Sequence, residues 1–517
     1  MNAVVWGMVL RMGQALLQGA PFIVTGLCVA GILDRLMGHA ATRRMFGSNS
    51  LVSLLQSWLI GMLLPGCSLG VIPICRRLRA SGISTGTIFA FALSSPLFDP
   101  LSLLYGLTLS RPFTILAFAT CSLVVVTVSG AALDRMFPDS GAERPDDPPC
   151  PAGIKRVLAV AVSMARETTG PSAGLVACGL VGVGVLAALL PAGSLQTAMA
   201  HENRWSPLLM TAIALPAYAT PMTAMGQLGS MFQHGNSVGA AFVLLAFGAG
   251  MNLGLVAWMA WNYGWRRLVV WFALLFAVVI AISYGIERPL YPSGIEPADH
   301  THAFDRYCAP FESGVEPPRG YPGEVVHRLA VDTQPHEWFG ASILALLVVV
   351  GVALRRLDPA RRVDAWLTAS PGASATGLRY DVVLPGPVVA VLVFAVIVAM
   401  SVAGCFAYYP APHQALQELS QATTEVASAA VAGDRAHALE WIPVCEGWNR
   451  RLVVGTYLRR WAVSDYHLAK SRLLEERLEE LEHAAEDAAE TDLRDAALAA
   501  SRAFLRVSRA WTTEALD

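Results

Sequence analysis

A single carboxylate interrupts an otherwise uncharged apolar stretch in the first quarter of the chain. Asp99 lies in Ser94-Ser-Pro-Leu-Phe-Asp-Pro100. Charged groups inside a membrane are costly and usually face a cavity or a partner. We therefore predict that Asp99 contacts a ligand or carries a proton. The alternative is that it caps a half-helix between Pro96 and Pro100, because proline pairs mark helix ends.

Neutral polar side chains gather around two further stretches that prolines interrupt. The first is Leu63-Leu-Pro-Gly-Cys-Ser-Leu-Gly-Val-Ile-Pro73 and the second is Leu215-Pro-Ala-Tyr-Ala-Thr-Pro221. In lipid, a carbonyl freed by proline is tolerated only where it faces protein or a wet cavity. The polar groups could line a pathway, or they could hydrogen-bond between helices. The predicted pathway residues are Pro65, Cys67, Ser68, Pro73, Ser94, Ser95, Pro96, Asp99, Pro216, Thr220, Pro221 and Asn252.

Two histidines and one cysteine could bind a soft or borderline metal. They are His300, His302 and Cys308, and these residue types are common metal ligands. Their spacing matches no strong motif, and loop histidines are usually only exposed, so both interpretations stay open. The nine cysteines include no CxxC pair, and the sequence predicts no cofactor.

The elements that must position these residues are long apolar segments. The chain is 54% hydrophobic and 15% charged, whereas soluble domains carry about 25% charged residues. A membrane-spanning helix needs about 20 mostly apolar residues, and roughly ten segments meet that criterion. Since lipid offers no backbone partner, we predict an all-α polytopic membrane bundle. The segments centre on Val9–Leu33, Leu51–Ile74, Thr85–Leu107, Phe113–Leu133, Ser172–Leu190, Leu208–Leu228, Val238–Trp261, Leu268–Tyr284, Phe339–Leu354 and Val388–Phe406.

Several classes of protein are disfavoured by composition and motifs. A formal net charge of −2 gives no basic field for nucleic acid. There is no Walker A sequence and no enzyme signature. The first residues lack a basic region and a cleavage site, so we expect the first apolar segment to remain as a membrane helix. We expect a multi-pass protein of the plasma membrane, in contact with lipid.

The first half of the chain repeats itself. Pro21 and Pro171 are 150 positions apart, and Gly82-Ile-Ser-Thr-Gly86 matches Gly235-Asn-Ser-Val-Gly239. Interrupted helices at corresponding places in two halves point to a secondary transporter, although proline kinks are common in membrane helices. We predict repeats at residues 1–136 and 154–284.

The basic residues leave the orientation of the segments open. The arginines near position 77 and those near position 358 each predict a cytoplasmic loop. Simple alternation through ten spans places these loops on opposite sides. One interrupted segment could therefore be re-entrant or miscounted, and the repeats could be parallel or inverted.

Three further regions follow the repeats. We predict a polar loop at residues 285–337, two more spans with a basic connector at 338–408, and a helical accessory domain at 409–517. In the last region, leucines at 468, 474, 478 and 481 form a stripe at helical spacing. Such bundles also serve as docking modules, so a protein partner stays open.

Three stretches of the chain resemble the ArsP-type permeases. They are Pro65 to Pro73, Gly82-Ile-Ser-Thr-Gly86 and Phe91-Ala-Leu-Ser-Ser-Pro96. The resemblance covers about residues 1–283 and implies secondary transport, with efflux of a small molecule, metalloid or metal ion. Leu69 stands where that family often has a second cysteine, and one thiol is a weak soft-metal site. The alternative function is a membrane scaffold or sensor with a vestigial permease core and a partner-binding bundle.

Overall fold

The computed structural model describes residues 2–47, 50–109, 112–137, 153–191, 194–195, 197–292, 302–311, 314, 316–369, 386–487 and 490–513. The regular elements of the described residues are helices, and within these residues the only β-type pairing is an isolated bridge between Ala200 and Asn236. The chain divides into two compact units. Unit 1 comprises residues 1–103 and 113–399, and unit 2 comprises residues 104–112 and 400–517.

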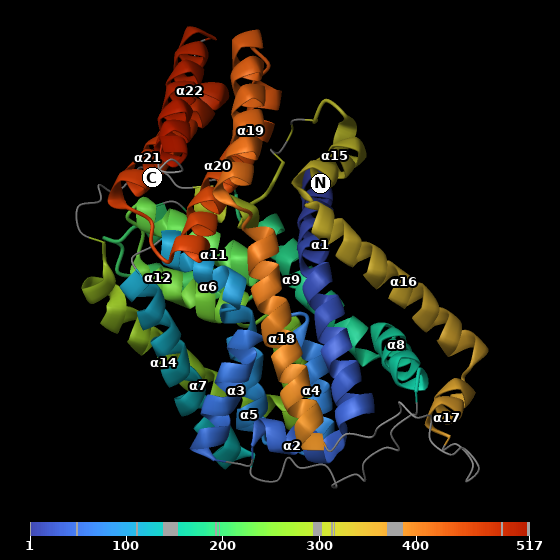
Figure 1. The fold of residues 1–517 in the computed structure, drawn as a ribbon. Helices are drawn as coiled ribbons and strands as arrows, with labels where there is room; N and C mark the ends of the chain where they lie inside the picture. The colour runs from blue at the N-terminus through green and yellow to red at the C-terminus, as the bar shows by residue number, and fades with distance from the viewer. Residues whose placement is uncertain are drawn as a thin grey trace. The chain divides into compact units, whose positions relative to one another are not determined.

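Unit 1 holds both halves that the sequence pattern marks (Figure 1). Two helices, α6 (Pro100–Leu109) and α18 (Gly386–Tyr408), contribute to both units. The other helices of unit 1 are α1 (Asn2–Ile32), the π-helical turn η1 (Leu33–Met37), α2 (Gly38–Phe46), α3 (Leu51–Leu63), α4 (Val71–Ala80), α5 (Thr85–Leu97), α7 (Pro112–Met136), α8 (Lys155–Thr168), α9 (Pro171–Leu189), η2 (Thr197–Met199), α10 (Ser206–Ala214), α11 (Pro221–Gln233), α12 (Val238–Val243), the π-helical turn η3 (Leu244–Ala249), α13 (Leu253–Tyr263), α14 (Trp265–Leu290), η4 (His302–Tyr307), α15 (Gly320–Asp332), α16 (Pro335–Leu357) and α17 (Arg362–Thr368).

The described residues contain six helices long and apolar enough to cross a membrane, or eight spans when two bent pairs are included. The bent pairs join α5 to α6 at 51° and α12–η3 to α13 at 62°. The prediction of about ten spans therefore exceeds the six to eight that the described residues offer. The segments Leu51–Ile74 and Leu208–Leu228 do not cross, because each is broken into two short helices. The longest of these short helices has 13 residues. At 1.5 Å per residue it is about 20 Å long, which is shorter than the hydrocarbon core of a bilayer at about 30 Å.

The first broken segment enters and leaves on one face of unit 1. We call residues 51–80 re-entrant segment 1 and residues 64–70 tip 1. Near the start of its first arm, Gln56 donates to the carbonyl of Met45 at 2.5 Å. At the end of its second arm, Arg43 donates to the carbonyl of Ser81 at 3.1 Å. Met45 and Arg43 both belong to α2, so the chain turns back at tip 1 instead of crossing.

The second broken segment has the same form. We call residues 206–233 re-entrant segment 2 and residues 215–220 tip 2. The hydroxyl of Ser206, at its start, donates to the carbonyl of Ala198 at 2.8 Å. Just beyond its end, the N–H of Ser237 donates to the carbonyl of Met199 at 3.0 Å. Both ends therefore lie at η2.

The two re-entrant segments enter from opposite faces, because α1 and the α8–α9 pair are antiparallel. A Cβ atom on Gly184, late in α9, would meet Met12 in the first half of α1. A Cβ atom on Gly31, at the end of α1, would meet Val160 in α8. The end of α1 leads to α2 and segment 1, whereas the end of α9 leads to η2 and segment 2. We call the face from which segment 1 enters the α2 face, and the face from which segment 2 enters the η2 face.

The predicted polar loop at 285–337 contains more structure than its composition suggested. It includes the end of α14, then η4 and the 13-residue helix α15. Tyr321, Val325 and Leu329 recur at four-residue spacing and pack with Phe311 against the first helix. Prolines and acidic residues mask this short apolar stripe in the sequence.

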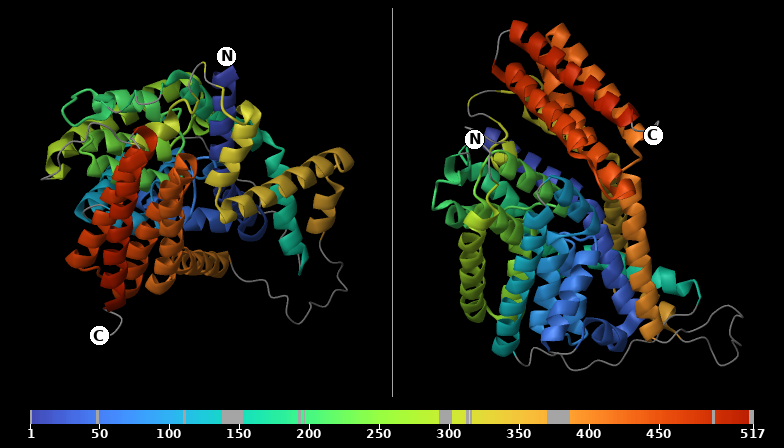
Figure 2. Two further views of the ribbon diagram at one scale, coloured as in Figure 1. Left: turned by 90° about the horizontal axis from the view of Figure 1, so that it is seen from above. Right: turned by 60° about the vertical axis from the view of Figure 1, so that its left-hand side comes forward.

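Unit 2 is built around four helices that lie side by side in both views of Figure 2. Its core is rich in alanine and leucine, and Leu474, Leu478 and Leu481 are fully buried in it. Leu468, the fourth leucine of the predicted stripe, is partly buried against the same core, so the stripe is confirmed as the face that packs inward. Trp511 joins this core, whereas Trp461 is 79% exposed. The helices are α19 (Pro412–Ala432), α20 (Arg435–Arg460), α21 (Asp465–Asp487) and α22 (Glu490–Thr513).

We expect Leu478→Ala to destabilise a fragment of residues 409–517 by about 2–5 kcal/mol, because it removes buried methyl groups and leaves a cavity. Urea unfolding followed by circular dichroism measures the change. Leu498→Ala is the matched control: this side chain is 50% exposed, and we expect a change within about 0.5 kcal/mol. Equal effects of the two substitutions would contradict the observed core.

Candidate functional site

The tips of the two re-entrant segments meet inside unit 1. Cys67 of tip 1 and Tyr218 of tip 2 are buried in one apolar cluster with residues of α1 and α9. The side chains of Tyr218 and Cys67 lie together in this cluster, without a hydrogen bond of normal geometry between them. Both residues take the third position after the leucine that opens each tip, Leu64 and Leu215. Equivalent positions of the two breaks thus face one another.

Tip 1 packs backbone to backbone against the middle of α1. A Cβ atom on Gly26 would lie far below 3.0 Å from the carbonyl oxygen of Gly70. A Cβ atom on Gly70 would lie 2.5 Å from the carbonyl oxygen of Phe22. Only glycine fits at such distances. The position of Cys67, whose thiol accepts from the N–H of Gly70 at 3.3 Å, therefore depends on two glycines in elements far apart in sequence.

Three buried polar atoms near the tips lack partners. They are the hydroxyls of Ser68 and Tyr218 and the side-chain amide nitrogen of Asn252, and none has a hydrogen bond of normal geometry within the described part of the chain. Asn252 lies close to tip 1, because a Cβ atom on Gly179 would touch both Leu69 and Asn252. An unsatisfied buried polar group costs about 1–3 kcal/mol. Unsatisfied groups of this kind are usually completed by a ligand or an ordered water.

Asp99 and Asn252 occupy equivalent places in the two bent spans. Asp99 precedes α6, and its Oδ1 accepts from the N–H of Ser102 at 2.6 Å. Asn252 precedes α13, and its Oδ1 accepts from the N–H of Leu255 at 2.9 Å. Both are almost fully buried, at 3% and 1% exposure. The structure thus gives Asp99 the capping role, while its role as a pathway carboxylate stays a prediction.

Asp99→Asn should preserve the cap, because the side-chain oxygen of Asn252 makes the same bond in the second bent span. We expect Asp99→Ala to cost about 1 kcal/mol of stability and to impair transport, while Asp99→Asn keeps most of both. The measurements are the melting temperature of the purified protein and transport in vesicles across a pH range. Loss of pH dependence in Asp99→Asn, with the fold intact, would instead support proton coupling.

The other predicted pathway residues divide between the tips and helix ends. Ser95 donates to the carbonyl of Leu64 at 3.3 Å and so fixes α5 to tip 1, whereas Ser94 donates to Phe91 within its own helix. Thr220 caps α11, accepting from the N–H of Thr223. The prolines mark tips and helix ends: Pro65 and Pro216 lie in the tips, Pro73 and Pro221 in the first turns of α4 and α11, and Pro96 in the last turn of α5.

A carboxylate clamp in the second half ties α14 to the start of α12. Glu287 accepts from the hydroxyl of Ser237 at 2.8 Å and from the N–H of Gly239 at 2.5 Å. Ser237 is also the cap of α12. Gly239 is required here, because a Cβ atom on it would lie 2.7 Å from the carbonyl oxygen of Ser283.

The same clamp occurs in the first half. Asp134 of α7 accepts from the N–H of Gly86 at 2.7 Å and from the hydroxyl of Ser84 at 3.3 Å. Each of these residues precedes its counterpart by 153 positions, as Asp99 precedes Asn252. Sequence reasoning missed both carboxylates, because the apolar segments were ended at Leu133 and Tyr284. Their signal was the shared offset of 153.

The ArsP_1 family model, described as a predicted permease, matches residues 7–287. This match covers more than half of the chain. The chain belongs to the ArsP_1 family of permeases.

The family region of this permease runs from α1 to α14 and so contains both re-entrant segments, both bent spans and both clamps. UPF0718 protein YcgR of Bacillus subtilis (strain 168) is 30% identical over 135 residues, which are 26% of this chain and 46% of that protein. The match thus spans about half the length of the relative. No solved structure is significantly similar.

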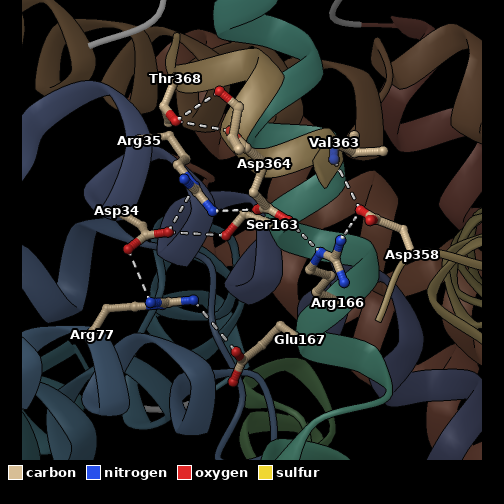
Figure 3. A network of polar contacts seen from close by, with 11 residues as sticks. Asp34, Arg35, Arg77, Ser163, Arg166, Glu167, Asp358, Val363, Asp364 and Thr368 are labelled. Atoms are coloured by element: carbon tan, nitrogen blue, oxygen red, sulfur yellow. Dashed lines mark hydrogen bonds and ion pairs between the residues drawn. The ribbon is translucent and has the colours of Figure 1, made fainter. Parts of the chain in front are cut away.

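The α2 face of the permease carries a network of ion pairs (Figure 3). Asp34 in η1 pairs with Arg77 of α4 at 2.9 Å, and Arg77 also faces Glu167 of α8 at 3.6 Å. Arg35 pairs with Asp364 of α17 at 2.8 Å. This network brings the arginines near position 77 and those near position 358 to one face, because neither re-entrant segment crosses the membrane.

Further ion pairs join α8 to the segment after α16. Arg166 pairs with Asp364 at 2.7 Å and with Asp358 at 2.8 Å. Asp358 also accepts from the N–H groups of Arg362 and Val363. The basic connector after α16 is therefore fixed to the family region of the permease.

Of the three predicted metal ligands, only Cys308 has a described side chain. His300 lies outside the described residues, and the side chain of His302 is not among those described. Cys308 is buried, and its carbonyl accepts from Arg11 at 3.3 and 3.2 Å. The neighbouring Tyr307 donates to Gln227 at 2.7 Å, and burial raises the pKa of Tyr307 to about 12, so it stays a donor. The described residues hold no group of three or more metal-ligating side chains, and the metal site stays a prediction.

Proposed function

We propose that the protein is a secondary permease whose substrate passes between tip 1 and tip 2, and that it exports a small molecule or metalloid. The observation that supports this most is that three buried polar atoms at or near those tips, on Ser68, Tyr218 and Asn252, make no hydrogen bond of normal geometry within the described residues. Irregular backbone at membrane depth is tolerated where it lines a substrate site. Membership of a permease family supports the same proposal.

We also propose that residues 1–136 and 154–284 are inverted repeats. Their re-entrant segments enter from opposite faces, and their clamps share one offset, with the carboxylate of the second clamp at Glu287, just beyond residue 284. Inverted repeats of this kind place the substrate site between the halves, and rocking of one half against the other exposes it to each side in turn. The meeting of Cys67 and Tyr218 at equivalent positions fits such an axis.

The α2 face should be cytoplasmic, because it carries most of the arginines near the ends of the spans. A phosphatase reporter that works only outside the cytoplasm should be inactive when fused after Ala360 and active when fused after Tyr291, near the η2 face. A fluorescent reporter that works only inside should give the reverse. The opposite pattern would contradict the assignment of faces.

The transport test starts from the chemistry of Cys67. A thiol beside a phenol suits a single bond to a soft centre such as trivalent arsenic, whereas a tightly held metal ion needs more ligands. A deletion strain is screened for sensitivity to arsenicals, copper and zinc, and export is then measured in everted vesicles. Tyr218→Phe should lower transport about tenfold if the hydroxyl binds substrate through a hydrogen bond worth about 1.5 kcal/mol.

Cys121→Ala is the control for Cys67→Ala, because Cys121 is a free thiol in α7. Equal transport in both variants would remove the thiol from the proposed mechanism. Transport of none of the tested substrates, with a partner protein bound at residues 409–517, would favour the scaffold or sensor hypothesis.

A further inference from the structure

The α2 face holds a cavity of about 600 Å³. Its volume is typical of sites that bind small molecules. Its lining comes from several elements: η1, re-entrant segment 1, α8, the start of α9, α13, and the chain just before and within α17. The charged residues of the lining are Asp34, Arg35, Arg76, Arg77, Arg79, Arg166, Glu167, Arg361 and Asp364.

The cavity has an excess of positive charge. Six arginines line it against three carboxylates. Four of the arginines, at positions 35, 76, 77 and 166, form ion pairs with those carboxylates. Within the described part of the chain, Arg79 and Arg361 have no carboxylate at ion-pair distance. The charges of these two guanidinium groups are therefore not neutralised by a carboxylate of this part of the chain.

Arg79 and Arg361, the two arginines without a carboxylate partner, differ in their surroundings. The guanidinium of Arg79 stacks on the ring of Tyr263, 4.4 Å from its centre, and its Nη1 is buried without a hydrogen bond. Arg361 adopts a left-handed backbone, with φ of 52°. That conformation is unfavourable for a side chain with Cβ and is often retained at functional sites.

Two further features favour an anion. Gly170 and Pro171, at the N-terminal end of the 19-residue helix α9, belong to the lining. The dipole of that helix places partial positive charge there. Trp258 and Asn262 of α13 also line the cavity, so an apolar ring and an amide are available beside the arginines.

We propose that this cavity is the loading site for a small soluble organic anion, whose acidic head group pairs with Arg79 and Arg361. Guanidinium groups bind carboxylate and phosphate through paired hydrogen bonds. The identification of this anion as the transported substrate rests on the proposed permease function. The binding of the anion to the cavity does not.

The test measures binding and transport separately on the full chain. Benzoate and inorganic phosphate are titrated into the purified protein in lipid nanodiscs without anionic lipid, and binding is followed by calorimetry and by the rise in melting temperature. We expect saturable binding of benzoate. We expect Arg361→Gln and Arg79→Gln to weaken it about tenfold or more, since a hydrogen bond to a charged group contributes about 1.5–3 kcal/mol. Arg361→Lys should retain part of the affinity.

Arg356→Gln is the matched control, because Arg356 is an exposed arginine near the same connector but outside the lining. We expect its benzoate affinity to stay within twofold of the wild type. Absence of benzoate binding, or equal weakening in Arg356→Gln and Arg361→Gln, would overturn the proposal. Stabilisation by phosphatidylglycerol nanodiscs alone would also overturn it and would assign the arginines to a lipid head group.

Uptake of labelled benzoate into proteoliposomes separates the two proposals. If Arg361→Gln slows the uptake of benzoate, the result supports both the anion site and the transport of the anion. Binding without uptake supports the anion site and counts against benzoate-type anions as transported substrates. Export of another substrate without any anion binding leaves the permease function standing and overturns the loading site.

Discussion

Alanine in place of Gly26 should abolish transport and lower the melting temperature of the permease. The added methyl group would overlap the backbone carbonyl of Gly70, which cannot rotate away as a side chain could. Relief requires tip 1 to move away from α1, and overpacking of this kind costs about 3 kcal/mol. Because Cys67 and Ser68 belong to the same tip, the shift also displaces the proposed substrate contacts. Transport in vesicles and thermal unfolding of the purified protein measure the two effects.

Gly174→Ala is the control for this experiment. Gly174 lies in the helical span α9, and nothing lies within 4 Å of a Cβ atom there. Alanine is favoured over glycine in a helix by about 0.5–1 kcal/mol, so this variant should be as stable as the wild type or slightly more stable. Normal transport and stability in Gly26→Ala would show that tip 1 does not pack on α1 as described.

Glu287→Ala should destabilise the second half of the permease by about 3 kcal/mol, because hydrogen bonds to a charged group contribute about 1.5–3 kcal/mol each. It removes the acceptor for Ser237 and Gly239 and the partner of His201, whose Nδ1 lies 2.7 Å from the carboxylate. The start of α12 would then be released from α14. Melting temperature and recovery of folded protein from the membrane provide the measurement.

Two variants make this prediction specific. Asp134→Ala removes the corresponding clamp of the first half and should have an effect of similar size. Glu202→Ala removes an exposed carboxylate that follows η2 and should change stability by less than about 0.5 kcal/mol. If Glu202→Ala and Glu287→Ala behave alike, the clamp does not hold α12 to α14.

The match between Gly82-Ile-Ser-Thr-Gly86 and Gly235-Asn-Ser-Val-Gly239 has a physical basis in these clamps. The first glycine of each set adopts positive φ, at 74° and 68°. The serine caps the helix that follows, and the last glycine allows a neighbouring helix to approach closely. A sequence pattern can show such a set, because each residue type is fixed by local geometry. The distant carboxylate that completes each set is marked only by the shared offset of 153 positions, and its contact with the set is decided by the fold.

The sequence by itself determined that the chain is an all-α membrane protein and where its apolar helices break. Apolar length and proline position are local properties, and they mark α5, α9 and both tips correctly. Local properties do not determine the direction of the chain after a break. Only contacts with α2 and η2 decide that residues 51–80 and 206–233 turn back, so about ten predicted spans become six to eight.

The meeting of the tips was also decided by tertiary structure alone. Cys67 and Tyr218 are 151 positions apart and differ in chemistry, so no spacing rule joins them. Their contact follows from two segments that enter opposite faces and are seated on α1 and α9. The arginine-lined cavity arises in the same way, because its charges come from elements spread between η1 and α17. Asp99 shows the difference most directly: the sequence left it either a carboxylate that contacts a ligand or carries a proton, or a helix cap, and the fold shows the cap bond at the start of α6.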